Sequence, residues 1–260
     1  MNYSTTQTTA LASLQEGNNL AEINLLHGDC LELMKGMPDE SVDLIITSPP
    51  YNLGNTHHTG GKRFKPYGKY NDDMKELDYQ DWQIEVLNEC FRILKSDGSM
   101  LYNHKNRISK GVQITPYQWI LKTNFVIKQE IVWQNGSQNF DKIRFYPFTE
   151  RIYWLAKSPK TKLFNAINHH DVFTKVDWNS VGTKGKFKRA FPVKMVEELL
   201  ACFPSADVVL DPFMGSGTTG VACIDSKRSF VGMKLDENYF KMANERIADA
   251  ITKNEESGGK

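Results

Sequence analysis

A motif of six residues, Thr47-Ser48-Pro49-Pro50-Tyr51-Asn52, follows the apolar run 42–46 in this chain of 260 residues. Two successive prolines fix the backbone and remove two N–H donors, so nearby carbonyl groups remain as acceptors. Ser48 adds a hydroxyl acceptor and Tyr51 a flat aromatic face. Together these groups suit a planar ring that carries an amino group. A rigid turn whose tyrosine only packs would use the same residue types.

A second motif, Asp211-Pro212-Phe213-Met214-Gly215-Ser216-Gly217-Thr218-Thr219-Gly220, comes directly after the apolar run 207–210. Its glycines allow backbone N–H groups to approach a ligand closely, and the Asp211 carboxylate can accept from an ammonium or hydroxyl group. A phosphate-binding loop would end in Gly-Lys-Ser/Thr, whereas this one reads Gly-Thr-Thr. A glycine turn can also be purely structural, but the Asp-Pro-Phe lead favours a ligand loop.

Both motifs need strands that end at one edge of a sheet, and the chain alternates short apolar runs with helical patterns, as parallel sheets flanked by helices do. The predicted strands are Ile23–His27, Val42–Thr47, Ser99–Tyr102, Phe125–Trp133, Arg151–Ala156, Asp207–Leu210 and Ser229–Met233. The predicted helices are Tyr79–Leu94, Pro192–Cys202, Thr218–Asp225 and Glu237–Ile251. Ligands of such sheets bind at the carboxyl ends of the strands, where both motifs lie.

Composition narrows the class of protein. With 40% hydrophobic and 24% charged residues, the chain is long enough to bury a substantial core, which excludes disorder throughout. No stretch resembles a membrane span or a secretory signal, which predicts a soluble, non-secreted protein with no membrane partner, cytoplasmic in a bacterium or nuclear in a eukaryote. The four cysteines are far apart, and we expect buried, reduced thiols.

Positive charge is concentrated in two segments, although the whole chain has a formal charge of only +1. Residues 54–70 hold Lys62, Arg63, Lys65 and Lys69 without an acid, and read as a long basic loop. Residues 157–189 contain eight Lys or Arg against two Asp, a net of +6, with interleaved aromatics. Basic residues mixed with aromatics suit phosphate contact and base stacking, although solvated loops share this composition. The histidine pairs 57–58 and 169–170 lack further ligands at metal spacing, so we expect no metal site.

The domain prediction is a flexible arm over residues 1–20, which are polar and without apolar periodicity, and one catalytic domain over 21–251. This domain includes the basic loop and a target-recognition segment at about 157–189. Residues 252–260 are predicted to be a flexible tail or linker.

The two motifs together resemble those of S-adenosylmethionine-dependent DNA amino-methyltransferases, which methylate the N4 amine of cytosine or the N6 amine of adenine. The likeness runs from about residue 23 to 251, and the order of the motifs is similar to the beta arrangement, with the basic segment between them. It implies a Rossmann-like methyltransferase fold: a mostly parallel, seven-stranded sheet with helices on both faces, circularly permuted. It also implies S-adenosylmethionine as cofactor, double-stranded DNA as substrate, and a homodimer and a cognate restriction enzyme as candidate partners.

The resemblance assigns roles residue by residue. The implied catalytic residues are Ser48, Pro49, Pro50 and Tyr51. The implied cofactor residues are Asp29, Phe191, Asp211, Phe213, Gly215, Gly217, Thr218, Thr219, Lys234 and Asp236. The expected DNA contacts are Lys62, Arg63, Lys65, Lys69, Lys184, Lys186, Lys188 and Arg189. Lys234 departs from the family, which usually has an acidic residue there for the ribose hydroxyls. Lysine cannot accept hydrogen bonds, so Asp236 or water must replace that contact, or affinity falls.

Ser48 before Pro-Pro-Tyr is typical of the N4-cytosine subclass, so the preferred activity is methylation of N4 of cytosine in a flipped-out base. N6-adenine methylation remains the alternative, because serine and aspartate can both accept from an amine. A rival of another class is a catalytically weak module that binds S-adenosylmethionine and DNA, which Lys234 favours. Methylation of protein glutamine or RNA fits Ser48 and the motif order less well.

Overall fold

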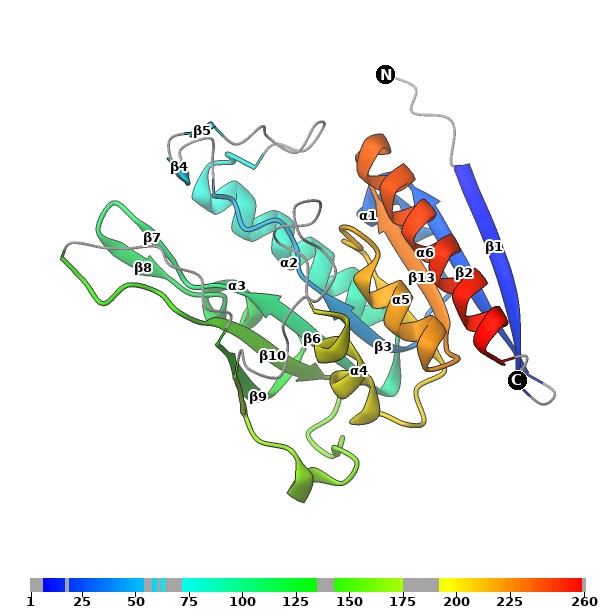
Figure 1. The fold of residues 1–260 in the computed structure, drawn as a ribbon. Coiled ribbons are helices and arrows are strands. Elements are labelled where there is room, and N and C mark those ends of the chain that lie inside the picture. The colour runs from blue at the N-terminus through cyan, green and yellow to red at the C-terminus, as the bar shows by residue number, and fades with distance from the viewer. Residues whose placement is uncertain are drawn as a thin grey trace.

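The computed structural model describes the backbone of residues 7–16, 19–53, 58–59, 62–63, 72–134, 143–174 and 192–258, most of it in one large sheet with its flanking helices (Figure 1). The strands are β1 (Gln7–Glu16), β2 (Asn19–His27), β3 (Val42–Thr47), β4 (His58–Thr59), β5 (Lys62–Arg63), β6 (Leu94–His104), β7 (Arg107–Ser109), β8 (Val112–Ile114), β9 (Val126–Trp133), β10 (Glu150–Ala156), β11 (Val172–Phe173), β12 (Val208–Asp211) and β13 (Ser229–Lys234). The helices are α1 (Cys30–Lys35), α2 (Glu76–Ile93), α3 (Tyr117–Ile120), the 3₁₀ helix η1 (Ala166–Asn168), α4 (Val193–Ala201), α5 (Thr218–Asp225) and α6 (Glu237–Gly258).

The main sheet has the strand order β1-β2-β13-β12-β3-β6-β10-β9-β11. Strands β2, β13, β12, β3 and β6 pair in parallel, and β10 is antiparallel to both β6 and β9. All predicted strands are present in this sheet, so the predicted α/β fold is confirmed. Two strands extend it beyond the predicted seven: β1 pairs antiparallel with β2, and the short β11 pairs in parallel with β9. No strand was predicted before Ile23, because residues 7–16 are mostly Thr, Ser, Gln and Ala with little apolar periodicity.

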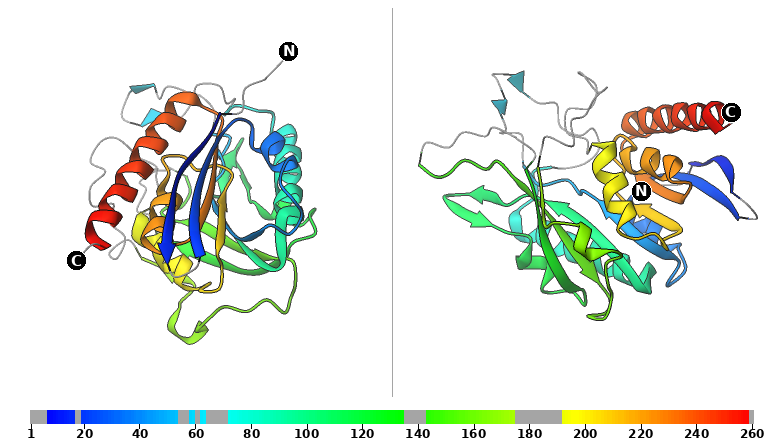
Figure 2. Two further views of the ribbon diagram at one scale, coloured as in Figure 1. Left: turned by 90° about the vertical axis from the view of Figure 1, so that its right-hand side faces the viewer. Right: turned by 60° about the horizontal axis from the view of Figure 1, so that its bottom comes forward.

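Helices cover both faces of the sheet (Figure 2). One hydrophobic core lies under α4, α5 and α6 and includes Met195, Ile224 and Ile247. The other lies under α1, α2 and α3 and includes Met34, Leu87 and Trp119. Because both faces are covered, the central strands are apolar on both sides, as a parallel sheet requires. Every residue of β3 except Asp43 is buried, which is why this strand reads as a continuous apolar run.

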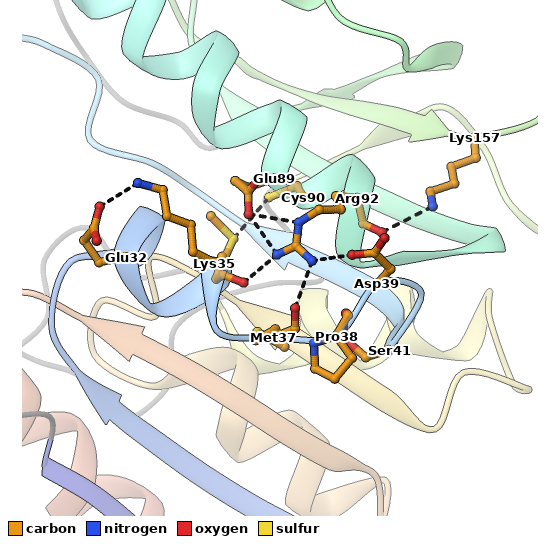
Figure 3. A network of polar contacts seen from close by, with 11 residues as sticks. Glu32, Lys35, Met37, Pro38, Asp39, Ser41, Glu89, Cys90, Arg92 and Lys157 are labelled. Carbon is orange, nitrogen blue, oxygen red and sulfur yellow. Dashed lines mark hydrogen bonds and ion pairs between the residues drawn. The ribbon is translucent and has the colours of Figure 1, made fainter.

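Arg92, at the C-terminal end of α2, fixes the chain segment that leads into β3 (Figure 3). Its guanidinium donates to the backbone oxygens of Met34 and Met37 at 2.7 and 2.9 Å, and it pairs with the carboxylates of Glu89 and Asp39 at 2.9 and 2.6 Å. Met34 lies in the last turn of α1, and a cation is favourable at a helix C-terminus. This clamp ties α1 and the loop before β3 to α2, and so helps to place the end of β3.

All four cysteines are buried and free of disulfides, as predicted. Within the described ranges, none of the helices has the length and apolar character needed to cross a lipid bilayer. Two small hairpins, β4–β5 and β7–β8, project beyond the sheet (Figure 1).

Candidate active site

The two motifs meet at the carboxyl edge of the sheet, because β3 and β12 are adjacent parallel strands with Leu44 opposite Val209 and Ile45 opposite Leu210. The last residue of β3, Thr47, donates a hydrogen bond of 2.6 Å from its hydroxyl to Oδ1 of Asp211, the last residue of β12. These two residues are separated by 164 positions in the chain. The strand ends that carry the diproline corner and the glycine loop are therefore side by side, as the sequence predicts.

Asp211 is a buried carboxylate held by several donors. Thr219 donates to its Oδ2 at 2.9 Å, and the backbone N–H of Phe213 donates to its Oδ1 at 3.0 Å. Burial raises the pKa of Asp211 to about 6, and the hydrogen bonds from Thr47, Thr219 and Phe213 oppose that rise. The carboxylate is therefore oriented in advance and suited to a cationic or hydroxyl-bearing ligand.

The glycine loop after Asp211 is fixed from α6 as well as from its own strand. Gly217, the N-cap of α5, has φ of 78°, and Gly215 has φ of 54°, conformations that non-glycine residues rarely adopt. Arg246 of α6 donates to the carbonyl and the hydroxyl oxygens of Ser216 at 3.1 and 2.9 Å, and to Thr218 Oγ1 at 3.0 Å. Sequence reasoning missed Arg246, since nothing in an amphipathic helix distinguishes a loop-binding arginine from a solvated one.

Phe213 leaves the loop toward α2, where its ring meets that of Trp82 edge-on with centroids 5.7 Å apart. Gly215 has different surroundings. Among described residues, a Cβ added there would meet nothing closer than Phe213 O at 3.8 Å. The loop thus packs on one side and leaves room on the other.

Three further predicted cofactor residues, Asp29, Lys234 and Asp236, lie at or just after the ends of the next two strands, β2 and β13. Gly28 N donates to Lys234 O at 3.0 Å, which joins the end of β2 to that of β13. Asp29 caps α1, accepting from Leu31 N at 2.9 Å, and Asp236 caps α6, accepting from Asn238 N and Tyr239 N, each at 3.0 Å. Both carboxylates thus have a structural task in addition to any ligand contact.

Lys234 lies at the end of β13, with its ammonium 5.2 Å from the centroid of the Tyr239 ring. Burial lowers its pKa, while the nearby carboxylates of Asp236 and Asp211 raise it. The structure therefore gives Lys234 acidic and aromatic neighbours. It remains a donor where an acceptor for ribose hydroxyls was expected.

The diproline corner carries a cluster of four polar side chains. Ser48 Oγ lies 2.7 Å from the Tyr51 hydroxyl, which donates to Glu150 Oε2 at 3.0 Å. The Asn103 amide nitrogen lies 2.5 Å from the Tyr51 hydroxyl, 2.9 Å from Glu150 Oε2 and 3.3 Å from Ser48 Oγ. Asn103 and Glu150 come from β6 and the start of β10, and the sequence motifs give no sign of either.

The back of the corner is also held. Tyr79 of α2 donates from its hydroxyl to Pro50 O at 2.7 Å, and the same hydroxyl lies 2.8 Å from His104 Nε2 and 3.0 Å from Gln83 Nε2. Burial lowers the pKa of His104 to about 3. The Tyr51 ring packs against the His104 ring with centroids 4.6 Å apart. Backbone and ring of the corner are thus positioned from behind.

Several predicted residues fall outside the described part of the chain: Phe191, Lys65, Lys69, Lys184, Lys186, Lys188 and Arg189. Lys62 and Arg63 form β5, of which the backbone alone is described.

The fold and the two joined strand ends define a Rossmann-like methyltransferase. The PvuII DNA methyltransferase, described as cytosine-N4-specific, superposes with a TM-score of 0.68 at 22% identity, covering 89% of this chain and 92% of that one. A complex of M1.HpyAVI with S-adenosylmethionine superposes with a TM-score of 0.56 at 24% identity, covering 86% of this chain and 99% of that one. These likenesses support the fold.

Sequence comparison gives the family. The DNA methylase family of N6- and N4-methyltransferases matches residues 42–245, so the chain belongs to the S-adenosylmethionine-dependent DNA amino-methyltransferases. The DNA adenine methyltransferase YhdJ of Escherichia coli K12 is 30% identical over 255 residues, covering 86% of this chain and 82% of YhdJ. The type II methyltransferase M.ScaI of Streptomyces caespitosus is 28% identical over 262 residues, covering 87% and 82%.

The cofactor of this family, S-adenosylmethionine, fits the groups present at the edge of the sheet. It carries a sulfonium, an ammonium and hydroxyl groups, and Asp211 offers a buried, oriented carboxylate beside a loop with room at Gly215. Among the predicted cofactor residues that the structure describes, Lys234 is the one whose chemistry does not match.

Proposed function

We propose that this enzyme methylates the exocyclic N4 amine of cytosine in double-stranded DNA, with the target base flipped into the site between the diproline corner and the glycine loop. One observation carries the proposal. The Thr47–Asp211 hydrogen bond joins the two strand ends, which supports one shared site for the Ser48 hydroxyl and the Asp211 loop.

An exocyclic amine is a poor nucleophile because its lone pair is delocalised into the ring. In the proposed mechanism Ser48 Oγ and the Pro49 carbonyl accept the two amine hydrogens and favour a pyramidal nitrogen. Bound S-adenosylmethionine supplies an electrophilic methyl group on a sulfonium. The corner is held by Tyr79 and His104 before any substrate arrives, and such preorganised positioning can contribute about 7–11 kcal/mol.

We assign the cofactor to the residues that line the adjoining strand ends. Asp211 would accept from a polar group of the methionine or ribose portion, and the loop residues Phe213, Gly215, Gly217, Thr218 and Thr219 would surround it. Asp29 would lie beside the adenine ring, and Phe191 would close over the methionine end. Asp236 is proposed to serve the ribose in place of Lys234.

A base inside a duplex cannot reach this site, so the nucleotide must swing out at a cost of a few kcal/mol and stack on Tyr51. His104 packs against the Tyr51 ring, which supports a fixed stacking platform. Phosphate contacts from Lys62, Arg63, Lys65, Lys69, Lys184, Lys186, Lys188 and Arg189 would offset the flipping cost. Binding should then weaken steeply with salt.

Adenine N6 is the second candidate, and the 30% identity with the adenine enzyme YhdJ favours it. Ser48 favours cytosine, and its hydroxyl is an uncharged acceptor held by Tyr51 at 2.7 Å. Mass spectrometry of nucleosides from DNA treated with the enzyme and cofactor decides between them. N4-methylcytosine supports the proposal, and N6-methyladenine without N4-methylcytosine overturns it.

A catalytically weak binding module is the rival that Lys234 suggests. Calorimetric titration with S-adenosylmethionine, followed by a methyl-transfer assay, separates the two. Cofactor binding without transfer to any DNA would favour the module.

We further propose a homodimer and a cognate restriction enzyme as partners. The type II methyltransferase M.ScaI supports the second of these. Sedimentation analysis of the purified chain tests the first, because a monomer at all concentrations would contradict it.

A further inference from the structure

Glu150 lies behind the catalytic hydroxyl of Ser48 and is joined to it through Tyr51. The distances are 2.7 Å from Ser48 Oγ to the Tyr51 hydroxyl and 3.0 Å from there to Glu150 Oε2. Asn103 lies alongside, with its amide nitrogen 2.9 Å from the same carboxylate oxygen. Three hydroxyl or carboxyl oxygens thus form a continuous row that ends in a carboxylate.

The number of hydrogens sets the direction of this row. A carboxylate has no hydrogen to donate, so the single hydrogen of the Tyr51 hydroxyl is the one that joins it to Glu150. The contact between Ser48 and Tyr51 must then use the hydrogen of Ser48. Asn103 Nδ2 donates to one lone pair of Ser48 Oγ at 3.3 Å, and the second lone pair is left to accept an amine hydrogen.

Asn103 reinforces this direction. Its amide nitrogen, not its oxygen, must face Glu150, because an amide oxygen at 2.9 Å from a carboxylate would be repelled. The amide nitrogen also lies 2.5 Å from the Tyr51 hydroxyl oxygen, so the phenol is held as an acceptor from Asn103 and a donor to Glu150. Asn103 is 2% exposed, whereas Ser48, Tyr51 and Glu150 are half-buried.

The phenol of Tyr51 keeps its hydrogen. Burial, and then the charge of Glu150, raise the pKa of Tyr51 well above its usual 10. Tyr51 is therefore a neutral hydroxyl that can pass a proton on in one direction while it receives another.

We propose that Glu150 is the terminal acceptor of the proton that the amine must lose, reached through the hydroxyls of Ser48 and Tyr51. The inference rests on the proposed role of Ser48 toward the amine and holds for cytosine or adenine alike. Glu150 is a positioning residue in this scheme, because it acts on the substrate only through Tyr51.

The step balances. The N–C bond to the methyl group forms from the amine lone pair, and the C–S bond breaks with its electron pair staying on sulfur. One N–H bond of the amine then breaks, and its proton goes to Ser48 Oγ. The Ser48 hydrogen moves to Tyr51, and the Tyr51 hydrogen moves to Glu150 Oε2. Both hydroxyls are restored and Glu150 ends as a carboxylic acid, which is partly exposed and can release the proton to water.

Single-turnover methyl transfer to an oligonucleotide duplex tests this in the full-length enzyme, with Glu150→Gln, Glu150→Asp and Glu130→Gln as variants. Gln keeps an acceptor at the same length but cannot take the proton, whereas Asp keeps the carboxylate. Glu130 pairs with Arg151 at 2.8 Å on the neighbouring strand and serves as the matched control.

We expect Glu150→Gln to slow transfer about 100-fold or more, because general-base catalysis typically contributes 10²–10⁴-fold. Cofactor affinity by calorimetry should stay within about twofold. Glu150→Asp should recover about a tenth of the wild-type rate, and Glu130→Gln should retain it.

A second readout does not depend on the rate. Infrared difference spectra of the wild type during one turnover should show a new carboxylic acid band that Glu150→Gln lacks. The inference is overturned if Glu150→Gln transfers at the wild-type rate, if Glu150→Asp is as slow as Glu150→Gln, or if no such band forms. A wild type that methylates no DNA base contradicts the proposed function and this inference with it, whereas an active wild type with an unimpaired Glu150→Gln contradicts the inference alone.

Discussion

Thr47 donates a 2.6 Å hydrogen bond to Asp211 and joins the end of β3 to the end of β12 inside the core. Both side chains are almost fully buried, with exposures of 0% and 3%. Neither strand end can therefore shift without disturbing the other. The distance between the diproline corner and the glycine loop is therefore fixed by the sheet and not by flexible loops.

Thr47→Val should weaken this joint. It removes the donor and leaves Asp211 Oδ1 with one fewer hydrogen bond, which costs about 1–3 kcal/mol in a buried setting. We expect a lower free energy of unfolding and about tenfold weaker binding of S-adenosylmethionine, measured by denaturant titration and calorimetry. Thr123→Val is the matched control, because the Thr123 hydroxyl has local partners, Ile120 O and Phe125 N. Equal cofactor affinity in the two variants would contradict the role of Thr47.

Asp211 predicts a pH dependence of stability in the cofactor-free enzyme. Its pKa is about 6 in the folded chain against 3.8 for the ordinary group, so the folded state binds the proton more tightly. The contribution is fully present below pH of about 4 and is lost as pH rises through about 6, a change of about 3 kcal/mol. Unfolding free energies of wild type and Asp211→Asn, measured across this window, should differ in slope. Parallel curves would show that Asp211 has an ordinary pKa.

Tyr79→Phe should loosen the diproline corner from behind. The Pro50 carbonyl loses its 2.7 Å donor, and His104 Nε2 and Gln83 Nε2 lose their partner. We expect about 1–3 kcal/mol of destabilisation and slower methyl transfer at unchanged cofactor affinity. Tyr117→Phe, which alters a hydroxyl bonded to Glu130, should leave the transfer rate unchanged. A wild-type transfer rate in Tyr79→Phe would contradict the role of Tyr79 in positioning the diproline corner.

Gly217→Ala and Gly111→Ala form a matched pair, because their φ angles are 78° and 81°. The backbone strain of about 1–2 kcal/mol should be common to both. A Cβ at Gly111 meets nothing within 4 Å, whereas one at Gly217 meets Ile247 Cδ1 at 2.9 Å. We expect Gly217→Ala to cost about 1–3 kcal/mol more and to weaken cofactor binding. Equal unfolding free energies for the two variants would show that Ile247 moves aside at no cost.

The sequence predicted most accurately those helices and strands whose first and last residues are fixed by neighbouring proline or glycine. The bounds of β3 and α5 agree with the prediction. The apolar run of β3 ends shortly before a proline pair, and α5 begins directly after a glycine in the left-handed conformation. Strand β6 begins earlier, at Leu94, and runs through Gly98. A Cβ at Gly98 would lie 2.9 Å from Asp43 O, so this glycine marks a close approach within the sheet.

The site residues that the sequence did not predict are brought together from distant parts of the chain. Asn103 and Glu150 are 47 positions apart, and they meet because β10 runs antiparallel beside β6. Their local sequences contain no motif, and only a strand order could have brought them to Tyr51. Asp29 and Asp236 were predicted as cofactor residues, and in the structure both cap a helix. Aspartate is common in helix caps and in ligand contacts, so the residue type alone does not tell the two roles apart.

Transfer of a deuterated methyl group from labelled S-adenosylmethionine to duplex DNA, read by mass spectrometry of the nucleosides, tests the central claim most directly. The account predicts labelled N4-methylcytosine with the wild type and a loss of about 100-fold or more with Ser48→Ala, while Ser48→Ala still binds the cofactor. Undiminished transfer by Ser48→Ala, or no labelled base with the wild type, would contradict it.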